Sequence, residues 1–118
     1  MDVDPGDLLR DAQQLVERGW TQHADSRDAD GDEVAPWAPN ARSWSLLGAI
    51  VAAAEQFAQL NQRDLPLQQL EVALDELAKL VDNDSLAAWN DATGRTQHEV
   101  AETLAAAGRS ASQRLPPR

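Results

Sequence analysis

The chain has no cysteine and no tyrosine, and it contains one methionine and one phenylalanine among 118 residues. The absence of cysteine excludes disulfide bonds and thiolate metal sites. The most apolar run, residues 46–54, is much too short to cross a bilayer, because a spanning helix needs about 20 residues. The N-terminal MDVDPGDLL is acidic and lacks the apolar segment of a secretory signal, so we expect a cytoplasmic protein without a membrane partner.

Basic residues are also scarce, since ten lysines and arginines face 20 acids and leave a net charge of −10. Three of the bases lie in the last ten residues, so residues 1–108 hold 20 acids against 7 bases, a charge of −13. Such a surface repels nucleic-acid phosphates and anionic lipid headgroups, so we expect no direct nucleic-acid binding. It suits simple solubility, a basic protein partner, or mimicry of nucleic acid.

The length fits one domain with one modest hydrophobic core. The first predicted helix covers residues 5–18, where Asp4 can cap the N-terminus, Pro5 suits the first turn and Gly19 follows as terminator. The apolar residues of this helix recur at helical spacing and form one stripe: Leu8, Leu9, Ala12, Leu15 and Val16.

The stretch WSLLGAIVAAA, residues 44–54, is apolar nearly all round at helical spacing. A helix of that kind is buried between other elements, so we predict a central core helix over residues 41–60 that starts near Asn40. Gly48 in its middle costs about 1 kcal/mol relative to alanine, which indicates the close approach of another backbone or of a tryptophan ring.

Residues 20–39 show no helical period and are predicted to form a small hairpin or an irregular loop. Asp30-Gly31 is a turn signal within this segment. Trp20 and Trp37 are the expected anchors that hold the segment on the helices.

Three acids in this loop, Asp28, Asp30 and Asp32, raise the alternative of a calcium site. In the EF-hand register Gly31 falls at the required turn position, but Trp37 stands where the bidentate glutamate is needed. We therefore expect an acidic turn and no metal.

Residues 66–81 form the next predicted helix, whose apolar residues are spaced three and four apart like the seam of a coiled coil. The run is short for such a seam, so we expect packing on the central helix, with a dimer seam as the alternative. The molecule is accordingly expected to be a monomer or a weak homodimer. The seam positions are Leu67, Leu70, Leu74, Leu77 and Val81.

The helical pattern is predicted to break at residues 82–84, and a short helix over residues 85–89 follows, with Asp84 as its cap. The last helix begins at Thr96, where Glu99 three residues on completes a capping box.

Gly108 is expected to end this last helix, and residues 109–118 are expected to form a disordered tail. The prediction is therefore a mainly α fold in one domain, residues 1–108. Its helices, about four in number, form a compact bundle around the central helix.

No known catalytic motif is present: there is no nucleophile elbow, phosphate-binding loop, dinucleotide-binding glycine motif or HExxH. His98 and Glu102 are four residues apart on one helix face, which is a metal-ligand spacing, and His23 would be needed to complete a site. The alternative is a solvent-exposed histidine. We predict neither a metal nor a cofactor.

A series of short motifs along the chain resembles one known family. The motifs are Gly19-Trp20-Thr21-Gln22, Arg27-Asp28-Ala29-Asp30-Gly31, Trp44 with Leu46-Leu47-Gly48-Ala49, Trp89-Asn90-Asp91, Gly94-Arg95-Thr96 and Glu99-Val100. Their order and spacing, over about residues 8–107, resemble those of a family of small proteins of unknown function from actinobacteria and their phages. The resemblance implies a host group and no activity. The chain departs from the family pattern at Ser45, where a cysteine is usual, so no thiol role carries over.

A candidate site is predicted at the end of the bundle where the loop before the central helix meets the loop before the last helix. There Arg95 can pair with Asp28 or Asp91 over a floor of tryptophans, and this end is expected to hold the main concave surface. The alternative is that the same groups only pin the long loop. The residues are Trp20, Gln22, Arg27, Asp28, Trp44, Asn90, Asp91 and Arg95.

The function hypothesis is a non-enzymatic module of actinobacterial or phage origin that binds a protein partner through its acidic surface. One alternative is an acidic mimic of DNA that occupies a DNA-binding protein. The other is a small enzyme or metal-binding protein that uses His98, Glu102 and nearby acids.

Overall fold

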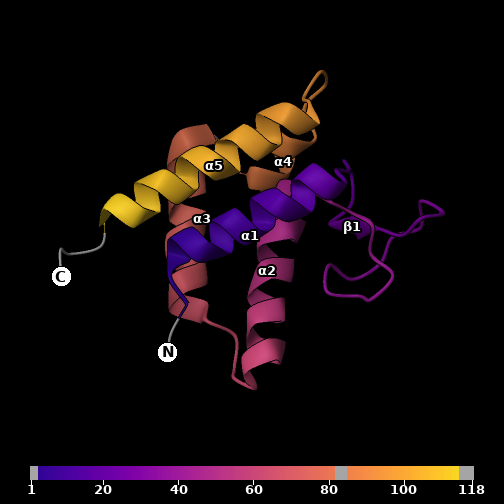
Figure 1. The fold of residues 1–118 in the computed structure, drawn as a ribbon. Coiled ribbons are helices and arrows are strands. Elements are labelled where there is room, and N and C mark those ends of the chain that lie inside the picture. Colours follow the sequence, from indigo (N-terminus) through magenta and orange to yellow (C-terminus); the bar gives the residue numbers. More distant parts are fainter. Residues whose placement is uncertain (1–2, 82–84, 115–118) are drawn as a thin grey trace.

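The computed structural model describes residues 3–81 and 85–114 and shows the mainly helical fold that the sequence predicts (Figure 1). Within these ranges the elements are α1 Pro5–Arg18, β1 Ser26–Arg27, β2 Ser43–Trp44, α2 Leu46–Asn61, α3 Leu67–Val81, α4 Leu86–Asn90 and α5 Gln97–Arg114. None of the helices so described is long and apolar enough to cross a membrane.

Two pairs of helices form two layers (Figure 1). In the first layer α1 and α5 lie side by side and antiparallel: Gln97 at the start of α5 donates to the carbonyl of Val16, and Gly6 lies beside Gly108. The second layer contains α2 and α3, and α4 lies near the N-terminal end of α2. The largest fully buried apolar side chains fill the core between the layers: Leu8, Leu9, Leu46, Ile50, Leu77, Leu104, Val16 and Val100.

Helix α1 has the predicted bounds and the predicted cap. The Asp4 carboxylate accepts a hydrogen bond of 2.8 Å from the N–H of Gly6, and Arg18 lies in the last turn, where a cation suits the helix dipole. The chain leaves the helix at Gly19, where a Cβ would stand 2.2 Å from the carbonyl oxygen of Arg42. Glycine is therefore required there by the close approach of a second backbone segment.

The predicted start of the central helix near Asn40 is wrong, because α2 begins at Leu46. The Ser45 hydroxyl caps α2 by accepting a hydrogen bond of 3.0 Å from the N–H of Gly48. The residues just before Ser45 belong to β2, whose antiparallel register with β1 places Trp44 opposite Ser26. Their backbone groups are thus used in strand pairing and are not available for a helix.

The predicted burial of the central helix is confirmed, and so is the explanation of its glycine. Leu46, Ile50 and Ala54 are fully buried. A Cβ at Gly48 would stand 1.9 Å from the carbonyl oxygen of Asp25, so the loop backbone passes directly over this helix.

The predicted turn at Asp30-Gly31 is confirmed: Gly31 has a φ of +87°, and Arg27 and Glu33 form an antiparallel bridge across the turn. The expected anchoring role of Trp37 is wrong, because its side chain is 50% exposed. Trp44 is buried instead, and its indole N–H donates to the carbonyl of Pro36 at 2.9 Å. Trp44 can anchor the loop in place of Trp37 because Trp44 lies in β2 and not in a helix.

Helix α3 forms where it is predicted, but its packing differs from the prediction. It lies mainly against α5 and α1, and only its edge meets α2. The last two seam positions, Leu77 and Val81, are buried in the interior of the molecule, whereas Leu67 is 66% exposed. The layers cross, so the N-terminal end of α3 extends beyond the helices that cover the rest of it (Figure 1).

The capping box at the start of α5 is confirmed, since Thr96 and Glu99 bond each other's backbone N–H groups at 3.1 Å. The predicted helix end at Gly108 is wrong, because α5 continues to Arg114 and buries Ala111 against α1. Gly108 lies in the helix–helix contact. The predicted break at 82–84 and the cap at Asp84 lie outside the described residues, and α4 is capped by the Ser85 hydroxyl.

Candidate functional site

Asn90 is the centre of a polar network at the junction of α4, α2 and the loop after α1. Its side chain is completely buried. Its carbonyl oxygen accepts from the indole N–H of Trp20 at 2.8 Å and from the N–H of Leu46 at 3.1 Å. Its amide nitrogen donates to the carbonyl of Thr21 at 3.1 Å and to the carboxylate of Asp91 at 3.0 Å. All four hydrogen-bonding positions of the amide are used.

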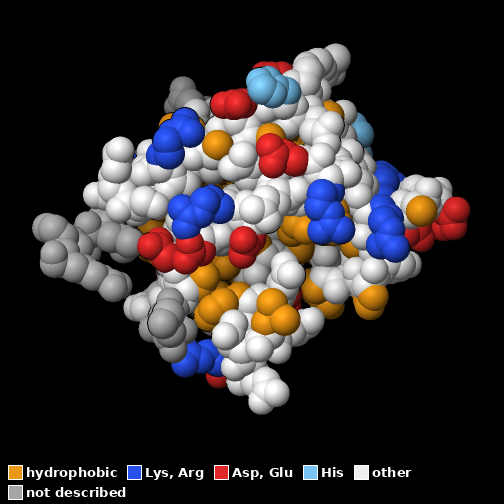
Figure 2. Space-filling view, in the orientation of Figure 1, with side chains coloured by type: hydrophobic (Ala, Val, Ile, Leu, Met, Phe, Trp, Pro, Cys, Tyr) orange, Lys and Arg blue, Asp and Glu red, His pale blue; other side chains and the backbone are white. Residues whose placement is uncertain are grey.

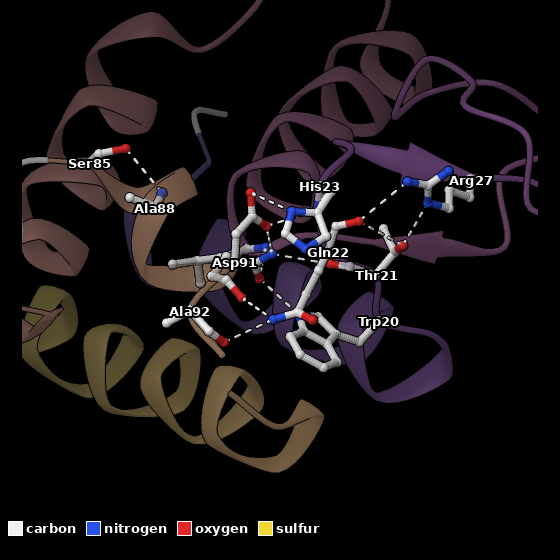
Figure 3. A network of polar contacts seen from close by, with 11 residues as sticks. Trp20, Thr21, Gln22, His23, Arg27, Ser85, Ala88, Asp91 and Ala92 are labelled. Carbon is white, nitrogen blue, oxygen red and sulfur yellow. Dashed lines mark hydrogen bonds and ion pairs between the residues drawn. The ribbon is translucent and has the colours of Figure 1, made fainter. Parts of the chain in front are cut away.

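The loop at residues 20–23 lies alongside α4 and is held there by two further side chains (Figure 3). Gln22 donates through its side-chain amide to the carbonyls of Asn90, at 3.0 Å, and Ala92, at 3.1 Å. The Asp91 carboxylate accepts from the N–H of His23 at 2.8 Å, and its second oxygen lies 3.7 Å from Nδ1 of the same histidine. Five of the predicted site residues therefore do meet at one end of the bundle: Trp20, Gln22, Trp44, Asn90 and Asp91.

Arg27 joins separate parts of the loop through its guanidinium (Figure 3). Its guanidinium donates to the hydroxyl of Thr21 at 3.0 Å and to the carbonyl of Gly31 at 2.9 Å. Asp28 lies in the acidic turn, where its carboxylate accepts from the N–H groups of Asp30 and Asp32 at 3.0 and 2.9 Å. Both predicted site residues thus stabilise the loop itself.

The predicted pairing of Arg95 with Asp28 or Asp91 is wrong: no such ion pair is present among the described residues. Arg95 instead stacks over the ring of Trp89 at 3.9 Å, donates to the Trp89 carbonyl at 2.9 Å and pairs with Glu99 at 3.1 Å. A guanidinium held between an aromatic face and a carboxylate one helical turn away is already well compensated.

The contacts in the first turn of α5 also shift the pKa of the Glu99 carboxyl. Partial loss of hydration raises the pKa of the Glu99 carboxyl, but hydrogen bonds from the N–H and hydroxyl of Thr96 and from Arg95 outweigh it. The pKa therefore lies below its ordinary value.

An acid-lined hollow of about 270 Å³ opens beside this network, between the loop, the β1–β2 turn region and α4. Asp25 and Glu33, both in the segment between α1 and α2, line it together with Asp91 at the end of α4, and His23 lines it as well. The side chains of Asp25 and Glu33 are exposed and have no hydrogen bond or ion pair to any described residue. Buried Ser45 and Asn90 also line the hollow. The sequence could not single out Asp25 and Glu33 among so many acids.

The prediction that this end holds the main concave surface is wrong. A hollow of about 740 Å³ lies at the opposite end of α2, around the loop to α3. It is lined by Phe57, Gln62, Arg63, Asp64, Leu65, Pro66, Leu67, Gln68 and Gln69.

The candidate metal ligands lie in three separate places. His98 and Glu102 lie 3.9 Å apart on the exposed face of α5, and no third ligating side chain joins them within the described ranges. His23 is elsewhere, against Asp91. The carboxylates of Asp28, Asp30 and Asp32 do converge, with oxygen atoms within 4.8 Å of one another, in the exposed acidic turn.

The charged groups on the face shown in Figure 2 form several separate acidic patches with arginine side chains between them. On this face, which α1 and α5 make, the described residues form no continuous acidic stripe of the kind that a phosphate-like array requires.

Fold and network together define a small two-layer helical protein whose long loop is fixed by one buried asparagine beside an acidic hollow. The chain belongs to DUF6197, a family of unknown function whose model matches residues 1–110. No curated protein and no solved structure matches it. The expected membership of a family of unknown function is confirmed, whereas an actinobacterial or phage origin stays a prediction.

Proposed function

We propose that this protein is a non-enzymatic module that binds a protein partner and takes a lysine or arginine side chain of that partner into the acid-lined hollow. The observation that carries the proposal is the state of Asp25 and Glu33. Both carboxylates face one hollow, and neither is paired within the described part of the chain. A cationic side chain would supply the missing charge-assisted hydrogen bonds.

The surroundings of the hollow favour binding in two ways. The net charge of −10 attracts a basic partner over long range and speeds its encounter. The fully bonded Asn90 holds Asp91, which lines the hollow, in place before a ligand arrives, so less conformational entropy is lost on that side on binding. The resemblance of the sequence motifs points to a partner in an actinobacterial or phage-infected cell.

The experiment is a selection of random peptides on the immobilised protein, followed by affinity measurements with purified variants. We expect enriched peptides to share a lysine or arginine. The double variant Asp25→Asn/Glu33→Gln should bind them about tenfold more weakly, because two charge-assisted contacts are lost.

The matched control is Glu71→Gln/Asp75→Asn, which removes the same charge from the exposed face of α3. It should leave the affinity within about twofold, since distant surface charges are screened by salt. Absence of enrichment, or equal loss of affinity in both double variants, would overturn the proposal.

A further inference from the structure

The turn between α2 and α3 carries three of the five large hydrophobic side chains that are exposed in the described residues. We define the α2–α3 tip as Phe57, Leu60, Leu65, Pro66 and Leu67. Leu60 and Leu67 are the two most exposed of the large hydrophobic side chains in the described residues, at 76% and 66%. Exposed apolar groups that gather around a hollow mark an interaction surface more often than isolated ones do.

Phe57 joins two hollows at this tip. On one side lies the hollow of about 740 Å³ around the α2–α3 loop, lined also by Leu65 and Leu67. On the other side, between α1 and α2, lies a hollow of about 230 Å³ that includes Leu15 and Leu60. Apolar side chains therefore lie on both sides of the C-terminal end of α2, among amide and charged groups, and Phe57 connects them.

The backbone of the tip is well fixed. Gln62 ends α2 in the left-handed conformation, with a φ of 51°, and the N–H of Arg63 returns to the carbonyl of Ala58 at 2.9 Å. The Asn61 side chain donates to the carbonyl of Phe57 at 2.8 Å. These bonds satisfy the last carbonyls of the helix, so the leucines are presented on an ordered turn.

Charge at the tip differs from charge on the rest of the molecule. One hollow is lined by Asp11 and Arg18, the other by Arg63 and Asp64, and the remaining polar groups are amides. Each hollow therefore has no net formal charge, whereas the whole chain carries −10. A strongly basic or acidic partner would find no excess of opposite charge here.

We propose that the α2–α3 tip is the contact surface for a second copy of this chain, related by a two-fold axis. Two molecules that each carry −10 repel one another, and a region of balanced charge is where they can approach. A two-fold contact pairs the surface with itself, so a surface with equal numbers of acids and bases, as at the tip, avoids net repulsion between the two copies.

The seam of α3 is continuous with this surface. Its N-terminal positions are incompletely covered, with Leu67 exposed and Leu70 and Leu74 half-buried, while Leu77 is fully buried. The uncovered half of the seam thus lies next to the tip and can extend a contact between two copies. The contact is small, so the dimer is a weak one.

Sedimentation equilibrium of the full chain tests the inference. The average mass should rise toward that of a dimer as the protein concentration approaches ~1 mM, the range expected for a small interface. The double variant Leu60→Gln/Leu67→Gln should raise the dimer Kd at least about tenfold, because two apolar side chains lose their burial. The control Leu80→Gln, at the other end of α3 and 45% exposed, should leave the Kd unchanged.

Cross-linking gives a second readout, since the chain has no cysteine of its own. Oxidised Leu67→Cys should form a covalent dimer far faster than oxidised Leu80→Cys. A mass that stays monomeric throughout, or a dimer insensitive to the substitutions at Leu60 and Leu67, would overturn the inference. So would a monomer whose selected peptides lose affinity on the same substitutions, because the occupant would then be a different protein.

Discussion

Single residues determine how the long loop is held, and Asn90 is the clearest case. Its buried amide joins the loop, α2 and α4 through four hydrogen bonds. No apolar or shorter side chain can satisfy the groups that face it. The Trp20 indole and the Leu46 N–H would each lose a partner inside the protein, where an unpaired polar group is costly.

Replacement of Asn90 by alanine should therefore lower the free energy of unfolding by about 2–4 kcal/mol. Urea denaturation followed by circular dichroism measures it. Asn40→Ala is the control, because Asn40 is exposed in the loop, and it should change the stability by less than about 0.5 kcal/mol. Equal small effects of the two substitutions would show that the network does not stabilise the fold.

Substitution by alanine is expected to have opposite effects on stability at two glycines that both lie inside helices. At Gly48 an added Cβ would stand 1.9 Å from the carbonyl of Asp25, so Gly48→Ala should destabilise the protein by more than about 2 kcal/mol. At Gly108 the nearest atom is the Cβ of Leu9 at 3.7 Å, an ordinary contact.

Gly108→Ala should accordingly raise the stability by up to about 1 kcal/mol through the better helix propensity of alanine. Thermal melts of the two single variants against the unmodified chain decide the matter. A stabilising Gly48→Ala would mean that the loop does not pass over α2 as described.

At the scale of elements, α5 depends on its first turn. Its capping box leaves Glu99 with a pKa below the ordinary value of 4.5. A carboxyl whose pKa is lowered by folding stabilises the native state above the pKa of the unfolded chain. That stabilisation disappears as the pH falls through the lower, native value.

Glu99→Gln should therefore lower the Tm at pH 7, and the difference from the unmodified protein should shrink as the pH falls below about 4.5. The control Glu102→Gln alters a carboxylate one turn along, whose partner is the exposed His98. It should change the Tm at pH 7 less than Glu99→Gln does. A difference for Glu99→Gln that is constant down to pH 3 would contradict the role given to the capping box.

The elements also show what a sequence can predict. The bounds of α1 and the start of α5 depend on caps within a few residues, Asp4 at one and Thr96 at the other, and both were predictable. The start of α2 was not, because Trp44 is withheld from the helix by pairing with Ser26, a contact remote in sequence.

The candidate site was likewise predictable from the sequence only in part. That Trp20 and Asn90 lie at one end of the bundle followed from the order of helices and loops. The partners of Arg95 could not be predicted from the sequence, because Glu99 in the capping box competes with every acid of the loop for the guanidinium. Asp25 and Glu33 face one hollow only because of the way the loop crosses α2.

At the scale of the molecule, the two proposed surfaces lie at opposite ends of α2 (Figure 1). A dimer joined at the α2–α3 tip would carry its two acid-lined hollows away from the contact. Both hollows could then engage a partner with two basic sites, and the second contact would be intramolecular. This arrangement rests on both proposals and would raise the avidity for such a partner well above that of one hollow.

An NMR titration tests most directly whether the hollow beside Asn90 binds a cationic side chain. The probes are N-acetylarginine methylamide and its neutral analogue N-acetylcitrulline methylamide, added to the labelled protein. We expect the arginine probe alone to shift the backbone amide signals of His23, Asp25 and Asp91, and Asp25→Asn/Glu33→Gln to abolish these shifts. Equal shifts with both probes, or shifts spread over all acidic regions and unchanged in the variant, would contradict the proposal.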